Sequence, residues 1–355
     1  MRASPALVAL IVVVVLPFVL EPYWVDKITG WIPLAVAALG LNLLTGYNGQ
    51  ISVGHGAIYG TGAYTAALLI TNWRWSFPAA IAAAAVVCFV VGVVIGLPAL
   101  RIKGLYLALV TLAVATLFPQ IVEQFSDVTK GSSGLQVTSP QFYRGQIRER
   151  SIRFEAPGWT GLAPDQWKYL YFVVLTVLCF VIVRNLVNSR VGRAMVAIRD
   201  NEVAAETNGV NVAKIKVITF GISSALAGVG GAMLILQKTS ANPSSFTIAA
   251  SIYFLVAVVV GGPATILGPA LGALFYGLFD GIIQPALPES TKPATPLILG
   301  VILILLMRLA PNGIAGTAKL LIYRRRVMRA ASASDAAVEV PEPASEPTPD
   351  QEAAR

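Results

Sequence analysis

The sequence predicts an all-α integral membrane protein, a polytopic bundle of about eight to ten transmembrane helices with broken or re-entrant segments. Three observations predict this class. Of the 355 residues, 56% are A, V, I, L, M, F, W, Y or C and 12% are charged, whereas soluble domains hold about 45–50% apolar and about 25% charged residues. The mean hydropathy is +0.71. Charge-free runs of spanning length recur along the chain, which argues against a soluble enzyme.

The charge-free runs define the expected spans, and they are residues 3–20, 28–73, 75–100, 104–122, 169–183, 217–237, 239–279 and 293–307. The run 28–73 is 46 residues long, enough for two spans. We expect the first run to be a retained helix, because no small-x-small cleavage site follows it. A signal peptide is the alternative for this run.

Lysine and arginine set the expected orientation. If the N-terminus is cytoplasmic, counting the crossings places 15 of the 26 Lys and Arg residues on cytoplasmic segments. The cluster Arg324–Arg326 places the C-terminus on the same side. The segment from Val217 then crosses outward and the run 293–307 crosses inward, so the chain between them must start and end outside.

That intervening chain has strong helix breakers at its centre. Ala250–Ile283 is 34 residues long, which is short for two full crossings and a turn, and it contains Gly261–Pro263 and Gly268–Pro269. We expect two short helices around a broken, partly re-entrant centre that faces the protein interior. One long kinked helix is the alternative.

A second glycine-rich segment extends from Thr45 to Ala63, and we expect it to be broken around Gly46–Gly62 as well. Its Gly56 and Gly60 are four residues apart, a spacing that lets helices approach closely. A phosphate-binding loop is not supported, because no Gly-Lys-Ser/Thr follows and the setting is a membrane span.

No catalytic or metal-binding set is visible. His55 is the single histidine, and Cys88 and Cys179 both lie in apolar runs. His55 is interpreted as a packed histidine or as a substrate or gating contact. Asp280 is the one acid deep in an apolar run, so it is either a functional intramembrane carboxylate or a residue that reaches the interface near Gln284.

The polar segment 185–216 has the features of a docking loop. Asp200 or Asn201 is expected to cap a short helix that extends to Asn208, and Gly209 is expected to end it. A short helix presented between two spans suits docking of a partner. An ordinary surface loop is the alternative.

This loop resembles the coupling loop of ABC importer permeases. Ala204, Ala205 and Gly209 match its Ala-Ala-x-x-x-Gly core, although Val203 stands where a glutamate is usual and Glu202 lies one position earlier. The loops of the branched-chain amino acid branch look similar to residues 199–206.

Two further blocks carry the same resemblance. Asn42–Tyr64 is similar to a signature near the second and third spans of that branch, and 258–273 is similar to its late Gly-Gly…Gly-Pro block, with Pro263 where leucine or methionine is common. The similarity extends from about Leu34 to Met307. The chain therefore resembles LivM-type permease subunits of branched-chain amino acid ABC importers. Its length and its long loop 123–168 favour this type over the LivH type.

The resemblance implies a bacterial plasma (inner) membrane protein that forms half of a translocation pathway and is not an enzyme. Its implied partners are a LivH-type permease subunit, ABC ATPase subunits that bind ATP, an extracytoplasmic substrate-binding protein and membrane lipid, with no nucleic acid and no cofactor on this chain. Residues 1–329 would form the permease domain, with a cytoplasmic coupling loop at about 188–216 and an extracytoplasmic loop at 123–168. Residues 330–355 would form a disordered acidic tail.

Two residue sets follow from these expectations. The ATPase-coupling candidates are Arg199, Glu202, Ala204, Ala205 and Gly209. The pathway candidates are Asn48, Gln50, His55, Gly261, Gly262, Gly268 and Asp280. Two alternatives remain open: an ABC permease for urea or short-chain amides, and an ion-coupled secondary transporter in which Asp280 or His55 carries a proton.

Overall fold

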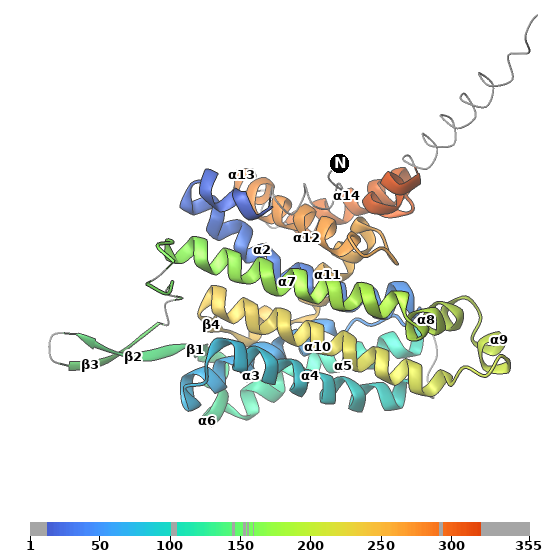
Figure 1. Cartoon of the computed structure of the whole chain (residues 1–355), viewed down its shortest axis with the longest axis horizontal. Coiled ribbons are helices and arrows are strands. Elements are labelled where there is room, and N and C mark those ends of the chain that lie inside the picture. The colour runs from blue at the N-terminus through green and yellow to red at the C-terminus, as the bar shows by residue number, and fades with distance from the viewer. Residues whose placement is uncertain are drawn as a thin grey trace, which may run out of the picture. The chain divides into compact units, whose positions relative to one another are not determined.

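The computed structural model describes residues 13–100, 105–143, 146–151, 154, 156–158, 160–290 and 294–320. Most of the described residues are helical and only a few lie in short strands, which confirms the predicted all-α class (Figure 1). Met1–Gly316 forms one compact unit, and Thr317–Arg355 forms another. The predicted acidic tail 330–355, the cluster Arg324–Arg326 and the start of the first expected span lie outside the described residues.

The main helices are α2 (Pro22–Leu41), α3 (His55–Trp73), α4 (Phe77–Ala99), α5 (Leu105–Gln124), α7 (Pro164–Asn188), α10 (Val212–Lys238) and α14 (Thr295–Leu309). Six stretches of the described chain are long and apolar enough to cross a membrane: Pro22–Tyr47, Phe77–Pro98, Tyr106–Gln124, Pro164–Asn188, Val212–Lys238 and Leu297–Leu320. The chain is therefore a multi-pass membrane protein, as predicted.

Local sequence explains several helix boundaries. Proline stands in the first turn of α2, α4 and α7, where its missing N–H would have no intrahelical partner. Arg74 and Thr239 adopt left-handed backbone conformations directly after α3 and α10, which turns the chain out of each helix.

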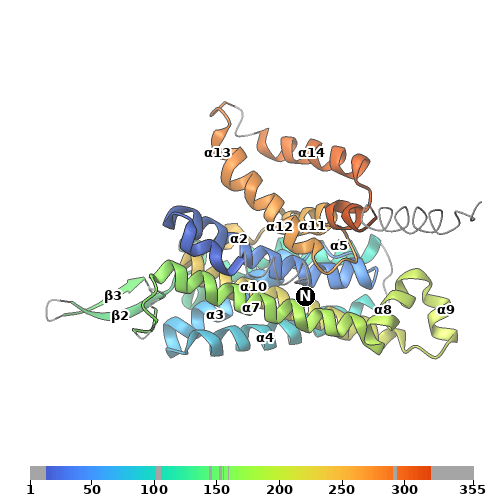
Figure 2. The same cartoon turned by 45° about the horizontal axis from the view of Figure 1, so that its top comes forward.

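Helix α10 is the centre of the bundle and packs against α2, α3 and α4. Its glycines make this possible. A Cβ on Gly228 would lie 2.7 Å from both the Ala84 carbonyl oxygen and the Cys88 side chain, and a Cβ on Gly231 would overlap the backbone of Tyr59. Small residues thus let the α10 backbone approach three neighbours closely. In Figures 1 and 2, α12 and α14 lie on the side of α2 away from α4.

The expected loop 123–168 contains short regular elements. They are α6 (Ser126–Thr129), η2 (Gly131–Ser133), β1 (Leu135–Gln136), β2 (Thr138–Tyr143) and β3 (Gln146–Ser151). Strands β2 and β3 form an antiparallel hairpin, and β1 pairs antiparallel with β4 (Ser240–Ala241), so that Leu135 lies opposite Ala241. Because Ala241 is fully buried and its carbonyl accepts a hydrogen bond from Tyr64, this pairing joins the loop to the bundle.

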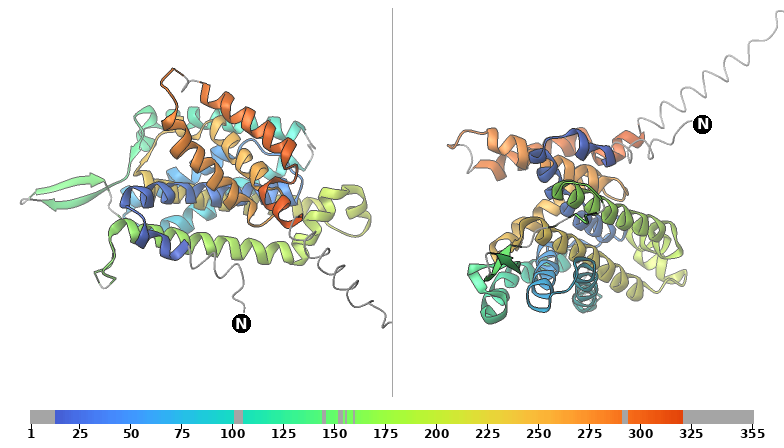
Figure 3. Two further views of the ribbon diagram at one scale, coloured as in Figure 1. Left: turned by 90° about the horizontal axis from the view of Figure 1, so that it is seen from above. Right: turned by 60° about the vertical axis from the view of Figure 1, so that its left-hand side comes forward.

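Residues 248–283 form a helical hairpin. Helix α11 (Ile248–Gly261) ends at a non-helical tip, residues 262–267, and α12 (Gly268–Leu278) returns against it. Gly261 abuts Gly268, and Gly272 abuts Ala257, so the two helices are antiparallel. This confirms the expected pair of short helices around a broken centre, and the alternative of one long kinked helix is wrong. Helix α12 continues through a π-helical turn, η4 (Phe279–Ile283), into α13 (Gln284–Ala286). Figure 3 shows the α11–α12 hairpin, in orange, from two further directions.

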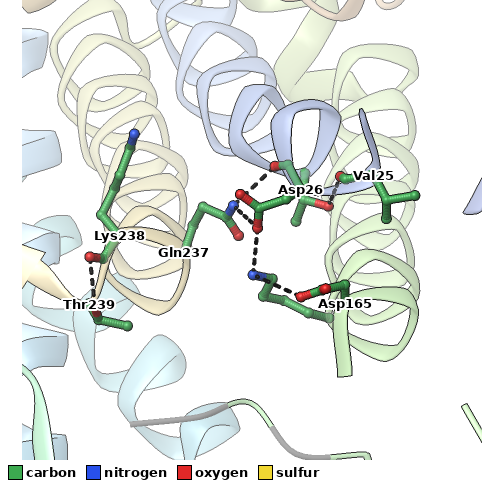
Figure 4. A network of polar contacts seen from close by, with 8 residues as sticks. Val25, Asp26, Asp165, Gln237, Lys238 and Thr239 are labelled. Carbon is green, nitrogen blue, oxygen red and sulfur yellow. Dashed lines mark hydrogen bonds and ion pairs between the residues drawn. The ribbon is translucent and has the colours of Figure 1, made fainter. Parts of the chain in front are cut away.

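A polar network fixes three helices at the end of the bundle where β4 lies, the β4 end. The ammonium of Lys168 lies 2.9 Å from the Asp26 carboxylate, and the Gln237 amide donates to the carboxylate and to the carbonyl of Asp26 (Figure 4). Asp26 belongs to α2, Lys168 to α7 and Gln237 to α10. Since the Asp26 side chain is half-exposed, this network sets helix register more than it adds stability.

We predict that Gly231→Leu destabilises the bundle. The new side chain would collide with the Tyr59 backbone, and such overpacking costs about 1–3 kcal/mol. Thermal unfolding in detergent should show an apparent Tm lowered by several degrees. Gly300→Leu on α14 is the matched control, because a Cβ on Gly300 has no neighbour within 4 Å. Equal unfolding curves for the two variants would contradict the close packing of α10.

Candidate functional site

The membrane segment that contains α2 is interrupted after Leu41. The helix widens into a π-helix, η1 (Asn42–Tyr47), and residues 48–54 are non-helical before α3 begins at His55. Gly49 has a φ of +72°, which requires glycine for an unstrained turn, and Gly54 packs against the Thr111 carbonyl. We call residues 48–54 the first break.

The tip of the α11–α12 hairpin, residues 262–267, is the second break, and Asn42 joins it to η1. The Asn42 amide donates to the carbonyl of Thr265 at 2.8 Å and accepts from the N–H of Ala264 at 2.9 Å. Asn42 is fully buried. Its side chain therefore satisfies two backbone groups that the broken helix leaves without helical partners. The two interrupted segments that the sequence predicted meet at one place.

Gly261, Gly262 and Gly268 shape this tip through their backbones. Gly262 has a φ of +111° and its carbonyl accepts a hydrogen bond from the Thr265 hydroxyl. Gly261 and Gly268 touch where α11 and α12 meet. These predicted pathway residues thus form part of the hairpin tip and the point where its two helices meet.

His55 is fully buried between α2 and α11. Its Nε2–H donates to the Ala37 carbonyl at 3.1 Å, and its ring makes an edge contact with Phe254. The adjacent N–H of Gly56 donates to the Ser251 hydroxyl. The packed-histidine interpretation describes this geometry, and a substrate contact by His55 stays a prediction.

Asp280 is not brought near the two breaks. It lies exposed in η4, where Lys27 donates to the adjacent Gly281 carbonyl and Trp31 packs against the turn. Lys27 and Asn42 are 15 residues apart on one helical segment, about 22 Å of helix axis. The structure therefore separates Asp280 from Asn48, Gln50 and His55, and its role stays a prediction.

The polar loop forms two short helices, α8 (Arg190–Asp200) and α9 (Glu202–Thr207). The Asn201 side chain caps α9 by accepting from the Ala204 N–H at 3.0 Å. Gly209 has a φ of +81°, and the N–H of the next residue, Val210, donates to the Ala205 carbonyl. The expected capped helix is confirmed, with Asn201 as its N-cap.

Two contacts connect this loop with the bundle. The Arg199 guanidinium donates to the carbonyl of Gly46 in η1 at 3.0 Å and is paired with Asp200. The ammonium of Lys216 on α10 lies 2.8 Å from the Glu202 carboxylate, and the Lys216 side chain is 9% exposed. Arg199 and Glu202 thus connect α8 and α9 with η1 and α10.

The other coupling candidates divide into a buried and an exposed group. Ala205 is buried and anchors α9, whereas Ala204 and Gly209 are exposed. A Cβ on Gly209 would enter open space. One face of α9, beside Gly209, is therefore exposed. The other face is held by the buried Ala205 and by the ion pair between Glu202 and Lys216 of α10.

Sequence reasoning did not select Asn42, Lys216 or Thr265 as site residues. The sequence feature that could have identified Asn42 is its position within an apolar run, because a buried amide there needs hydrogen-bond partners. No local sequence pattern predicted that Lys216 pairs with Glu202, because both residues lie in the polar segment 185–216 among other charged residues.

At the β4 end, α3, α10, η3 (Pro243–Phe246) and α11 border an open pocket of about 390 Å³. Aromatic and aliphatic side chains dominate the lining, and polar groups accompany them. The lining residues are Leu34, Tyr59, Leu234, Lys238, Ser240, Asn242, Ser245, Phe246, Ala250, Tyr253 and Phe254. An apolar side chain with a polar head suits such a surface.

Comparison with known proteins identifies the family. The family model described as branched-chain amino acid transport system / permease component matches residues 25–307. The chain belongs to this family. The permease is 30% identical over 317 residues to the high-affinity branched-chain amino acid transport system permease protein LivM of Salmonella typhimurium, covering 86% of this chain and 73% of the relative.

Other relatives agree with a LivM type. LivM of Escherichia coli K12 is 30% identical to the permease over 321 residues, covering 87% of this chain and 74% of the relative. LivH of the same organism is 26% identical over 295 residues, covering 79% and 91%. No solved structure shows a significant match. The permease is thus a LivM-type transport subunit, as its sequence blocks predicted.

We predict that Asn42→Ala impairs the permease. The change leaves the Ala264 N–H and the Thr265 carbonyl without their partner, and each unpaired buried group costs about 1–3 kcal/mol. Transport by the assembled system should fall roughly tenfold or more, with lower thermal stability of the purified permease. Asn72→Ala, at an exposed position near the end of α3, is the control. Wild-type uptake and stability for Asn42→Ala would show that the two breaks do not depend on this amide.

Proposed function

We propose that the permease forms one half of the translocation pathway of a bacterial plasma-membrane ABC importer for branched-chain amino acids. A LivH-type permease subunit would supply the other half. Two ABC ATPase subunits would bind and hydrolyse ATP, and an extracytoplasmic binding protein would deliver the substrate. The LivM and LivH names of the relatives support these assignments.

The observation that carries this proposal is the attachment of α9. Its free face includes the exposed Val203 and Ala204, which a groove of an ATPase subunit could receive. Its attached side is held by Lys216–Glu202, and Arg199 connects the preceding helix with η1. A displacement of α9 would therefore move the segment that leads into the first break.

This role sets the orientation. The α8–α9 loop and both termini would be cytoplasmic, in agreement with the bias of Lys and Arg. The loop 123–168 and the aromatic pocket at the β4 end would face the binding protein. Substrate would then enter near Tyr59 and Phe246 and pass the two breaks, where unwound backbone can contact a zwitterion.

The aromatic pocket favours hydrophobic amino acids over urea or short amides as the substrate. Tyr59, Phe246 and Phe254 offer apolar contact area, which stabilises a bound side chain by about 25 cal/mol per Å² of area removed from water. Urea has no apolar side chain and would gain nothing from this surface.

The first experiment is purification of the tagged permease from its native membrane in mild detergent, followed by identification of the co-purifying proteins. We expect a second permease and ABC ATPases. Reconstituted with the binding protein, the complex should take up leucine with ATP, without dependence on an ion gradient. Recovery of the permease alone, with ion-driven uptake, would overturn the importer proposal, and uptake of urea in place of leucine would overturn the substrate.

We predict that Gly209→Val uncouples transport. A β-branched residue at a φ of +81° is strained by about 1–2 kcal/mol, so the end of α9 should distort. Leucine uptake should fall roughly tenfold, while membrane insertion stays normal.

Gly209→Asn is the matched variant, because asparagine tolerates the left-handed conformation. It should keep most of the uptake. Full uptake by Gly209→Val would remove the coupling assignment, and equal losses in both variants would indicate that the side chain itself blocks docking.

A further inference from the structure

The open pocket at the β4 end contains a positive charge that no acid balances. Lys238, at the end of α10, is among its lining residues, and no aspartate or glutamate is among the lining residues that the structure describes. The remaining lining residues are apolar, aromatic or neutral and polar. A ligand in this pocket therefore meets a net positive charge, which favours a negatively charged group.

The ammonium of Lys238 is available to a ligand. Lys238 is exposed, and it forms no ion pair with any residue that the structure describes. The acid of the adjoining polar network, Asp26, is paired with Lys168 and bonded by Gln237, and it feels the charge of Lys238 only at longer range. In Figure 4 the Lys238 side chain lies apart from this network, and no dashed line reaches its ammonium.

Tyr59 supplies an uncharged donor to the same pocket. Tyr59 is only 6% exposed. Its hydroxyl bonds no residue that the structure describes, and it keeps some accessible surface, so it opens into the pocket that Tyr59 lines. A buried tyrosine hydroxyl usually has a hydrogen-bond partner. The Tyr59 hydroxyl therefore lacks a partner that a ligand in the pocket would supply.

Packing fixes the orientation of the Tyr59 ring. Its centroid lies 5.0 Å from that of Phe254 and 6.0 Å from that of Phe246. In addition, α10 approaches so closely that a Cβ on Gly230 would lie 3.1 Å from Cε2 of Tyr59. The direction of the hydroxyl is therefore set before a ligand binds, which lowers the entropic cost of binding.

These two groups suit a carboxylate better than an ammonium. The lysine ammonium has N–H donors and no acceptor, and the tyrosine hydroxyl adds an O–H donor. A cationic donor and a neutral donor match the two oxygens of a carboxylate, and charge-assisted hydrogen bonds of this kind are strong. The ammonium of an amino acid finds no acid in the lining and is left to neutral oxygens or water.

We propose that Lys238 and Tyr59 bind the carboxylate of the transported substrate, and that the pocket does not select for its ammonium. The aromatic lining receives the aliphatic side chain. The substrate class of the pocket therefore extends from branched-chain amino acids to branched-chain carboxylates that lack the amino group. This inference rests on the proposed function, since it takes the pocket to be the extracytoplasmic entrance of the pathway.

The test measures ligand binding to the permease in nanodiscs, with the subunits that co-purify with it and without the binding protein. Saturation-transfer NMR titrations compare leucine with 4-methylpentanoate, which lacks the ammonium, and with leucinamide, which lacks the carboxylate. We expect leucine and 4-methylpentanoate to bind within about threefold of each other, and leucinamide to bind roughly tenfold more weakly. Leucinamide binding as tight as that of leucine would overturn the proposal, and so would a roughly tenfold loss for 4-methylpentanoate.

Two variants locate the site. Tyr59→Phe removes only the unpartnered hydroxyl, and Lys238→Gln removes the charge at an exposed position, so both should fold normally. Each should weaken the binding of leucine and of 4-methylpentanoate roughly tenfold while leucinamide binding stays unchanged. Lys238→Arg should restore the preference for the carboxylate, because it restores the charge.

Matched controls make the same chemical changes away from the pocket. Tyr106→Phe lies on α5, where Tyr106 is 72% exposed. Lys214→Gln lies at an exposed position at the opposite end of α10, where α9 lies, the α9 end of the bundle. Both controls should bind all three ligands as the wild type does. Equal losses in the pocket variants and the controls would overturn the proposal.

The outcomes separate this inference from the proposed function. ATP-driven leucine uptake by the assembled importer, with leucine binding unchanged in both pocket variants, would remove the carboxylate site and leave the importer intact. Carboxylate-selective binding to a permease that co-purifies with no ATPase would instead remove the importer and leave the selectivity of the pocket.

Discussion

The amide of Asn42 is the contact on which the arrangement of the pathway candidates depends. Two membrane segments are broken, and broken backbone inside a membrane is tolerated only where protein or a water-filled cavity satisfies its polar groups. One fully buried side chain bonds both a donor and an acceptor at the tip of the α11–α12 hairpin. It also lies where Gly46 approaches Ala264 so closely that a Cβ would collide. The first and second breaks are thus held as one unit.

This unit is connected with the loop through short, identifiable contacts. Arg199 bonds the Gly46 carbonyl within η1, and η1 contains Asn42, which bonds the hairpin tip. Helix α10 runs alongside as a rigid element, with Lys216 near one end and Gln237 near the other. Because its glycines allow close contact with α3 and α4, α10 connects the charged α9 end with the polar network at the β4 end. A displacement at α9 therefore has a contiguous physical route into the bundle.

Two cavities lie at opposite ends of α10 and differ in their linings. The pocket at the β4 end is dominated by aromatic and aliphatic side chains, which suits the side chain of a hydrophobic amino acid. The cavity at the end of the bundle where α9 lies is lined by residues of the first break and by the ion pairs Arg199–Asp200 and Lys216–Glu202.

The sequence by itself determined the membrane class, the approximate helices, both breaks and the capped helix α9. These features follow from local rules, because apolar run length, glycine and proline placement, and an asparagine before a helix act within a few residues. Sequence blocks also determined the family. The tertiary structure alone decided that Asn42 joins segments 222 residues apart, that Lys216 pairs with Glu202, and that Asp280 lies far from the other candidates. Such contacts depend on how helices pack across the bundle, and no local pattern encodes which distant backbone group a buried amide will meet.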